Sequence, residues 1–132
     1  MSSKKNVQHV YLVGAKSLGA YGGYETFVYK LTKYHQNNEN IKYHVACKAN
    51  GDGCMDESKF EGVTKLNSHE FEFHNAHCFK INVPQIGPAQ AIYYDVAALK
   101  KCCEHIRKNH ISHPIVYIMA CRIGPFSSHF YR

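Results

Sequence analysis

The sequence lacks any apolar stretch long enough to cross a membrane or to form the hydrophobic segment of a secretion signal. Its first five residues include Lys4 and Lys5, and a short apolar run follows at residues 10–13. A membrane helix needs about 20 apolar residues, and a signal peptide needs an apolar segment of about 7–15. We therefore expect a cytoplasmic protein whose cysteines are reduced.

Cysteines with the spacing of a metal site are also lacking. None of the six cysteines belongs to a CxxC motif, and the adjacent Cys102 and Cys103 form a poor chelating pair. Buried free thiols are therefore a better interpretation than a metal site or disulfides.

Histidine is abundant, with ten residues, but no catalytic triad can be argued from its spacing. His69 and Glu70, followed by His74, resemble the HExxH motif with one residue too many. They also fall in an alternating segment, where a helical i, i+4 pair cannot form. We therefore exclude a zinc protease, assign no metal ligand, and expect His74 and His77, which flank a turn, to be exposed.

A concentrated basic stripe is lacking too. Lys and Arg number 16 against 10 acidic residues, and this formal charge of +6 favours anionic partners such as phosphates or an acidic membrane surface. The basic residues are scattered apart from the pairs at 4–5 and 100–101, so we expect no nucleic-acid partner. A basic surface without a specific partner remains the alternative.

The spacing of apolar residues predicts an α/β protein. Strands are expected at residues 8–13, 41–47, 69–74, 77–83 and 115–120, and helices at 24–35 and 89–108. The strands at 69–74 and 77–83 form a hairpin with its turn at 75–76, and residues 50–67 form a polar surface loop. We expect one domain over residues 1–132, a Rossmann-like open parallel sheet of βαβ units with this small hairpin inserted.

The same pattern predicts which side chains are buried. The wholly apolar run at 115–120 is typical of a central parallel strand. Helical spacing predicts that an apolar stripe of each helix faces the core. These stripes are Tyr24, Phe27, Val28, Leu31 and Tyr34 in the first helix, and Ile92, Val96, Leu99, Cys103 and Ile106 in the second.

Three loops rich in glycine or proline follow predicted strands, at residues 14–23, 84–88 and 121–125. Open parallel sheets bind ligands at the carboxyl ends of their strands, so these loops are expected to form a site. The first loop lacks the GxGxxG spacing, and no acidic residue ends the second strand, which argues against a dinucleotide. Gly14 and Gly19 have P-loop spacing, but Ala20 and Tyr21 replace the lysine and hydroxyl that bind triphosphate and magnesium.

Four segments in order resemble a group of bacterial glycosyltransferases that includes rhamnosyltransferases of capsule and cell-wall polysaccharide synthesis. They are residues 13–28, 82–89, 91–99 and 120–126, so the resemblance covers most of the chain from 7 to 126. It implies the amino-terminal half of a GT-B fold, in which this domain mainly holds the acceptor and a second domain holds the nucleotide-sugar donor. The implied reaction transfers rhamnose or a related sugar with retention of configuration, without an essential metal or a permanently bound cofactor.

The resemblance further implies a lipid-linked saccharide acceptor and peripheral contact with the inner face of the membrane. The chain departs from the group in its shorter first loop, in Ala76 where a turn glycine is common, and in its end at Arg132. The donor domain is missing, so we expect a half-site that is inactive alone. The alternatives are a catalytically silent module that dimerises through its sheet edge, and a nucleotide-binding enzyme of another class.

The residues expected to bind substrate lie in the first and third loops. They are Gly19, Tyr21, Gly22, Gly23, Glu25 and Arg122. The glycine pair would let a phosphate or sugar approach the helix N-terminus, or would form a sharp turn with positive φ. Glu25 would bind a sugar hydroxyl or complement the helix dipole. Arg122 has the geometry to bind a phosphate.

A second set of residues is expected to be structural: Asp95, Gly87, Pro88, Gly124 and Pro125. Asp95 lies on the half-apolar side of its helix, where a buried carboxylate needs a partner, and Arg122 is the expected one. Pro88 can begin a helix. Tyr24 could stack on a sugar, but packing in the core is the favoured interpretation.

Overall fold

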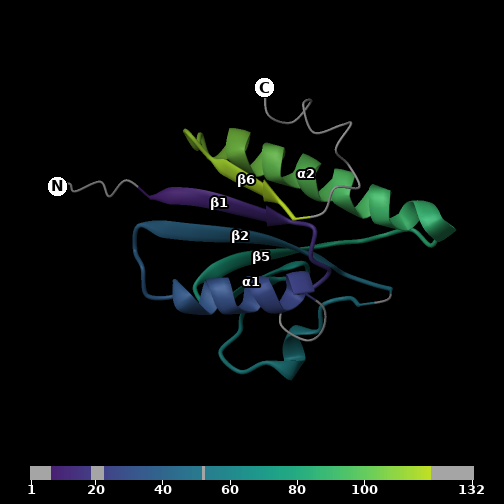
Figure 1. Cartoon of the computed structure of the whole chain (residues 1–132), viewed down its shortest axis with the longest axis horizontal. Coiled ribbons are helices and arrows are strands. Elements are labelled where there is room, and N and C mark those ends of the chain that lie inside the picture. The colour runs from purple at the N-terminus through teal and green to yellow at the C-terminus, as the bar shows by residue number, and fades with distance from the viewer. Residues whose placement is uncertain (1–6, 19–22, 52, 120–132) are drawn as a thin grey trace.

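A single six-stranded sheet organises the molecule, with one helix on each face (Figure 1). The computed structural model describes residues 7–18, 23–51 and 53–119. Its elements are β1 (Gln8–Val13), α1 (Gly23–Tyr34), β2 (Ile41–Lys48), β3 (Thr64–Asn67), β4 (Glu70–Phe73), β5 (Ala76–Ile81), α2 (Gln90–Lys108) and β6 (Ile115–Ile118). Single 3₁₀ turns lie at Glu57–Lys59 and Gly87–Ala89.

The strand order is β3-β4-β5-β2-β1-β6. The pairs β5–β2, β2–β1 and β1–β6 are parallel, whereas β3 and β4 run antiparallel to their neighbours. This is an α/β, Rossmann-like open sheet with an antiparallel hairpin at one side, which confirms the predicted fold class. The predicted helices and the strands of the parallel sheet are confirmed to within a few residues.

Strand alternation divides the core into two layers. In β1, Leu12 points to the layer beneath α1, and Tyr11 and Val13 point to the layer beneath α2. In β2 every residue from Tyr43 to Lys48 is buried, because both faces of this central strand are covered. Because β1, β2 and β5 are parallel, their carboxyl ends meet at one edge of the sheet.

The hairpin turn lies one residue earlier than predicted. His74 and Asn75 adopt left-handed φ angles of 54° and 61°, and Ala76 is already the first residue of β5. Two consecutive residues with positive φ match the twist of a two-residue hairpin, and asparagine tolerates this conformation. Ala76 therefore needs no glycine-like freedom.

The segment at 50–67 is not wholly a loop, because it contains a 3₁₀ turn and strand β3. All four residues of β3 are exposed, so the strand carries no alternation of apolar and polar residues that a sequence pattern could detect.

The predicted apolar stripes are confirmed in part: Val28 and Leu99 are buried, and Leu31, Val96 and Ile106 pack against the core. In α1 the buried residues are Val28 and Thr32, whereas Tyr24, Phe27 and Tyr34 are exposed, so the expected core position of Tyr24 is wrong. In α2 Ile92 is exposed. The buried residues of α2 are Tyr94, Asp95, Ala98, Leu99 and Cys102. Polar groups with partners explain the difference, since Thr32 Oγ1 donates to Val28 O at 2.9 Å and Tyr94 Oη donates to Ala15 O at 2.6 Å.

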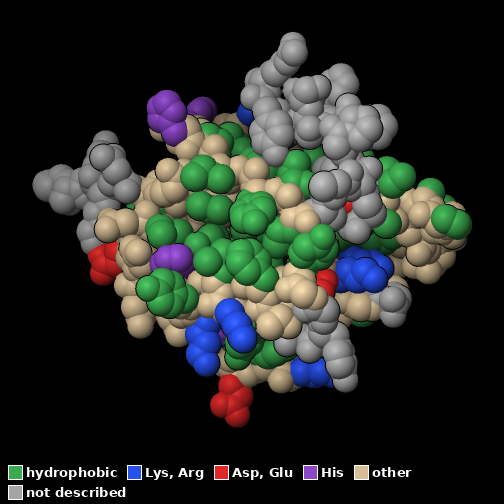
Figure 2. Space-filling model, in the orientation of Figure 1, with side chains coloured by type: hydrophobic (Ala, Val, Ile, Leu, Met, Phe, Trp, Pro, Cys, Tyr) green, Lys and Arg blue, Asp and Glu red, His purple; other side chains and the backbone are tan. Residues whose placement is uncertain are grey.

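Strand β6 is an edge strand of the described sheet and not a central one. Ile115 and Tyr117 are 50% and 47% exposed, and Tyr117 meets Phe27 of α1 edge-on. Figure 2 shows hydrophobic side chains gathered on the face that α1 shares with β1 and β6. The apolar run at 115–120 therefore predicted a strand correctly, but it did not predict the position of that strand in the described sheet.

Three of the five described cysteines, Cys47, Cys78 and Cys102, are buried, and none of the five forms a disulfide, which supports the sequence interpretation; Cys54 is exposed. No helix within the described ranges has both the length and the apolar character of a membrane span.

Candidate functional site at the carboxyl edge of the sheet

Backbone hydrogen bonds tie together the loops that follow β1, β2 and β5. Lys48 N donates to Lys16 O at 2.7 Å, which joins the end of β2 to the first loop. Ala49 N donates to Ile81 O at 2.8 Å, which joins it to the end of β5. Gly14 begins the first loop with a φ of 126°, a conformation that side chains disfavour. The predicted convergence of loops at this edge therefore holds for the two that are described, and the loop after β2 joins them.

Glu25 closes the first loop onto helix α1. Its Oε2 accepts a hydrogen bond from Lys16 N at 2.7 Å, and it lies in the first turn of α1. A carboxylate here also complements the positive end of the helix dipole. Both interpretations of Glu25 stay compatible with this geometry, since one carboxylate oxygen is used and a carboxylate has several acceptor positions.

Gly23 is the first residue of α1, and it is exposed. An added Cβ would meet no atom within 4 Å, and its φ is not left-handed. The sharp-turn explanation therefore does not apply to Gly23, and no atom of the described residues fills the position of its missing side chain. Gly19, Tyr21, Gly22, Arg122, Gly124 and Pro125 lie outside the described residues.

Asn50 fastens the loop after β2 to the loop after β5. Its Oδ1 accepts from Val83 N at 2.8 Å, and its Nδ2 donates to Val83 O at 2.9 Å. Lys48 Nζ and Gln85 Nε2 approach the same glycine, Gly51, to 3.6 and 3.4 Å of where its Cβ would stand. The edge thus contains a largely buried lysine, Lys48, and an amide, Gln85, that the sequence analysis did not single out.

The remaining structural candidates lie next to this edge. Gly87, with a φ of 75°, and Pro88 form the 3₁₀ turn that leads into α2. Asp95 is 1% exposed, so its carboxylate is buried as predicted. Its expected partner Arg122 lies outside the described residues.

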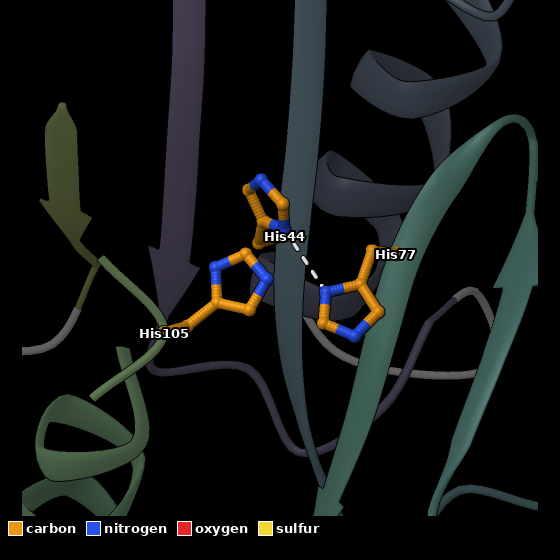
Figure 3. Close-up of side chains that lie close together, drawn as sticks. All are labelled: His44, His77 and His105. Atoms are coloured by element: carbon orange, nitrogen blue, oxygen red, sulfur yellow. Dashed lines mark hydrogen bonds between the residues drawn. The ribbon is translucent and has the colours of Figure 1, made fainter. Parts of the chain in front are cut away.

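A cluster of histidines lies on the α2 face of the sheet, away from these loops. His44 of β2 and His77 of β5 are direct partners in the strand register, and His105 of α2 packs over them (Figure 3). One ring nitrogen from each of the three lies within 4.8 Å of the others. His44 Nδ1 and His77 Nδ1 are 2.9 Å apart. These residues could hold a metal ion.

Each ring of this histidine cluster has a second partner. His77 Nε2 donates to Glu70 Oε1 at 2.7 Å, and His44 Nε2 lies 2.9 Å from His9 Nδ1. His105 Nδ1 lies 2.6 Å from Tyr11 Oη. Tyr11 is fully buried and stacks on His44 with ring centroids 4.4 Å apart, so the cluster is held rigidly.

Burial sets the charge of the cluster. It lowers the pKa of His44 to about 2, helped by the positive charge that His105 and His77 would carry if protonated. Burial also lowers the pKa values of His105 and His9. His44, His105 and His9 are therefore neutral at pH 7, which is the protonation state that binds metals.

A cavity of about 660 Å³ opens beside the cluster. His77 and His105 line it, together with Glu70, Lys100 and Lys101. Lys80 also borders it, but its side chain lies on the α1 side of the sheet, where it pairs with Glu57 at 2.9 Å. The cluster is thus reachable from solvent through the rings of His77 and His105.

Comparison with known proteins places the chain in one family. Residues 7–132 match a family described as a domain of unknown function, DUF1972. The chain belongs to the DUF1972 family. Neither the curated proteins nor the solved structures gave a match.

The expectation that His77 is exposed is wrong for this DUF1972 domain. Its side chain is only 13% exposed, because β5 lies inside the sheet and Glu70 covers the ring. His74 is half-buried, with its Nδ1 3.0 Å from Thr32 Oγ1. The sequence analysis missed His44 and His105 because the only signal for them is strand register and helix packing between distant segments.

Proposed function

We propose that this DUF1972 domain is the acceptor-side domain of a retaining GT-B glycosyltransferase, similar to rhamnosyltransferases of bacterial surface polysaccharide synthesis. Four ordered sequence segments that resemble this group support the proposal. Domains of the DUF1972 family also occur in glycosyltransferase-related proteins. In this proposal a further domain binds the nucleotide-sugar, and the chain works at the cytoplasmic face of the membrane without a permanent cofactor.

The observation that carries the proposal is the joined loop edge. Ligands of open parallel sheets bind where the carboxyl ends of the strands meet. There Glu25 Oε2 is held 2.7 Å from Lys16 N, no described residue fills the Cβ position of Gly23, and Lys48 lies at the end of β2. A carboxylate suits sugar hydroxyls, and lysine suits the diphosphate of a lipid-linked acceptor.

The test measures acceptor binding by saturation-transfer NMR, with a short-chain prenyl-diphosphate-linked glucose as the probe. We expect the wild-type chain to bind it and Glu25→Gln to bind about tenfold more weakly, because one charged hydrogen bond is lost. The amide oxygen of the introduced glutamine would still accept from Lys16 N, so the loop keeps its shape. The matched control is Glu61→Gln, an exposed glutamate between the 3₁₀ turn at Glu57–Lys59 and strand β3. An unchanged affinity in Glu25→Gln, or no binding by the wild-type chain, contradicts the proposal.

A second candidate is an interaction module that dimerises through its sheet edge. The specific observation behind it is β6, which has one neighbour among the described strands and exposes Ile115 and Tyr117. A strand edge beside apolar side chains is a template for pairing with another copy. Light scattering should then show a dimer that Tyr117→Lys converts to a monomer. A monomeric wild-type chain contradicts this candidate.

A further inference from the structure

We propose that His44, His77 and His105 form a zinc site with three protein ligands and a fourth position open to the cavity. This inference goes beyond the proposed sugar transfer and does not depend on it. The site lies on the α2 face of the sheet, whereas the acceptor edge lies at the strand ends.

The spacing of the ring nitrogens suits a small tetrahedral ion. Zinc–nitrogen bonds of about 2.0–2.1 Å place two ligand atoms about 3.3 Å apart in a tetrahedron. His44 Nδ1 and His77 Nδ1 are 2.9 Å apart, and all three ligand atoms lie within 4.8 Å of one another. Small side-chain shifts therefore bring the rings to zinc geometry. Figure 3 shows the three rings pointing toward one another from β2, β5 and α2.

The outer partners of the three rings resemble those of known metal sites. A histidine ligand usually donates its second ring N–H to a carboxylate, carbonyl or other acceptor, which fixes its tautomer and orientation. His77 donates Nε2–H to Glu70 at 2.7 Å. His105 has Nδ1 within 2.6 Å of Tyr11 Oη, which leaves Nε2 as its ligand atom. His44 has Nε2 within 2.9 Å of His9.

Zinc binding needs no net loss of protons here. Because the Glu70 carboxylate only accepts, His77 Nε2 carries a proton and His77 Nδ1 has a free electron pair. Without metal, His44 donates Nδ1–H to this pair, and His44 Nε2 accepts from His9 Nδ1. With zinc on both Nδ1 atoms, the His44 proton lies on Nε2 and is donated to His9 Nδ1, while the His9 proton moves to its own Nε2. The same number of protons is bound before and after.

The fourth position follows from the cavity. His77 and His105 line the cavity of about 660 Å³, whereas His44 is buried behind them. Three protein ligands and one open position distinguish a reactive zinc site from a closed structural one. A solvent oxygen would complete the tetrahedron. The Glu70 carboxylate adds negative charge behind His77.

The experiment uses the full chain without a histidine tag, stripped with a chelator and titrated with zinc ions against a competing chelator. We expect one zinc ion per chain. His77→Gln and His105→Gln should each weaken zinc binding by more than about tenfold, since each removes a ligand. Glutamine at either position keeps a polar side chain of similar reach, and circular dichroism checks that the fold survives.

Two further variants make the result decisive. Glu70→Gln keeps all three ligands but weakens the outer partner of His77, so zinc binding should fall by about 10–100-fold. Its side chain is 41% exposed, so this variant folds even where a ligand variant does not. His110→Asn is the matched control. It removes an exposed histidine at a φ of 52°, which asparagine tolerates, and should leave zinc affinity unchanged.

Cobalt identifies the ligands. Tetrahedral cobalt bound by nitrogen and oxygen should give visible ligand-field bands without a sulfur-to-metal charge-transfer band. A charge-transfer band would assign the metal to cysteine and overturn the proposal. Equal zinc affinity in the wild-type chain, His105→Gln and Glu70→Gln would overturn it too.

Discussion

The carboxyl edge and the histidine cluster are built in opposite ways. The edge is made of loops that backbone and amide hydrogen bonds hold together, such as Lys48 N to Lys16 O and Asn50 to Val83. The cluster is made of side chains on regular strands and a helix, where the register between β1, β2 and β5 brings Tyr11, His44 and His77 into one row.

This difference separates what each region can do. Loops on a protein surface can adapt to a large polar ligand. A row of stacked rings on strands fixes a few atoms closely, which suits a small ion. If the two regions are separate sites, a change in one should leave ligand binding in the other intact.

The largest effect is expected at the centre of the cluster. His44→Ala should lower the free energy of unfolding by about 3 kcal/mol, measured by urea denaturation with chelator present, because it opens a buried cavity and removes a partner of His9 and His77. Acceptor binding at the edge should remain. A loss below about 1 kcal/mol would show that the cluster contributes little to packing.

The edge could be predicted from the sequence because its signals are local. Residues 8–13 read as an apolar strand, and the loop from Gly14 follows it directly, so chain order alone placed this loop at the carboxyl ends. The cluster could not be predicted in this way. His44 is 33 residues from His77, and only the strand register makes them neighbours. The same limit explains why the burial of Tyr94 in α2 was not predicted, since nothing local shows that its hydroxyl reaches the Ala15 carbonyl.

The second effect tests how the edge is held. Asn50→Ala removes both hydrogen bonds to Val83, which is 3% exposed; Val83 N–H loses this partner, whereas Val83 O keeps Gln85 Nε2 at 3.3 Å. We expect a loss of about 2 kcal/mol in the free energy of unfolding, weaker acceptor binding and unchanged zinc affinity. Gln90→Ala is the control, because it removes only an exposed bond to Gln85 at the same edge. A fall in zinc affinity of Asn50→Ala would break the separation between the two regions.

Tyr94 of α2 tests the contact that joins the two regions. Its hydroxyl donates to Ala15 O of the first loop at 2.6 Å, and both residues are buried. Tyr94→Phe should cost about 1–2 kcal/mol, because the carbonyl loses its partner while packing is kept. His105 lies three helical turns further along α2, about 16 Å away along the axis. Zinc affinity should therefore stay constant, and a change of tenfold or more would show that the helix couples the loop to the cluster.

The smallest effect concerns the ion pair of Lys80, at the border of the cavity, with Glu57. Burial alone would raise the pKa of Glu57, but the hydrogen bond and charge of Lys80 outweigh it, so the pKa lies below its ordinary value of 4.5. A depressed carboxylate pKa stabilises the fold above that ordinary value, and this contribution is lost as the pH falls through the lower, folded-state pKa. Glu57→Gln should therefore cost up to about 1 kcal/mol at pH 7 and less at pH 3, measured against Glu61→Gln. Lys80 alternates with Phe79 along β5 and so lies on the opposite face of the sheet from His77, and the variant should therefore leave zinc affinity unchanged. An equal cost at both pH values would mean that packing, and not charge, stabilises this corner of the cavity.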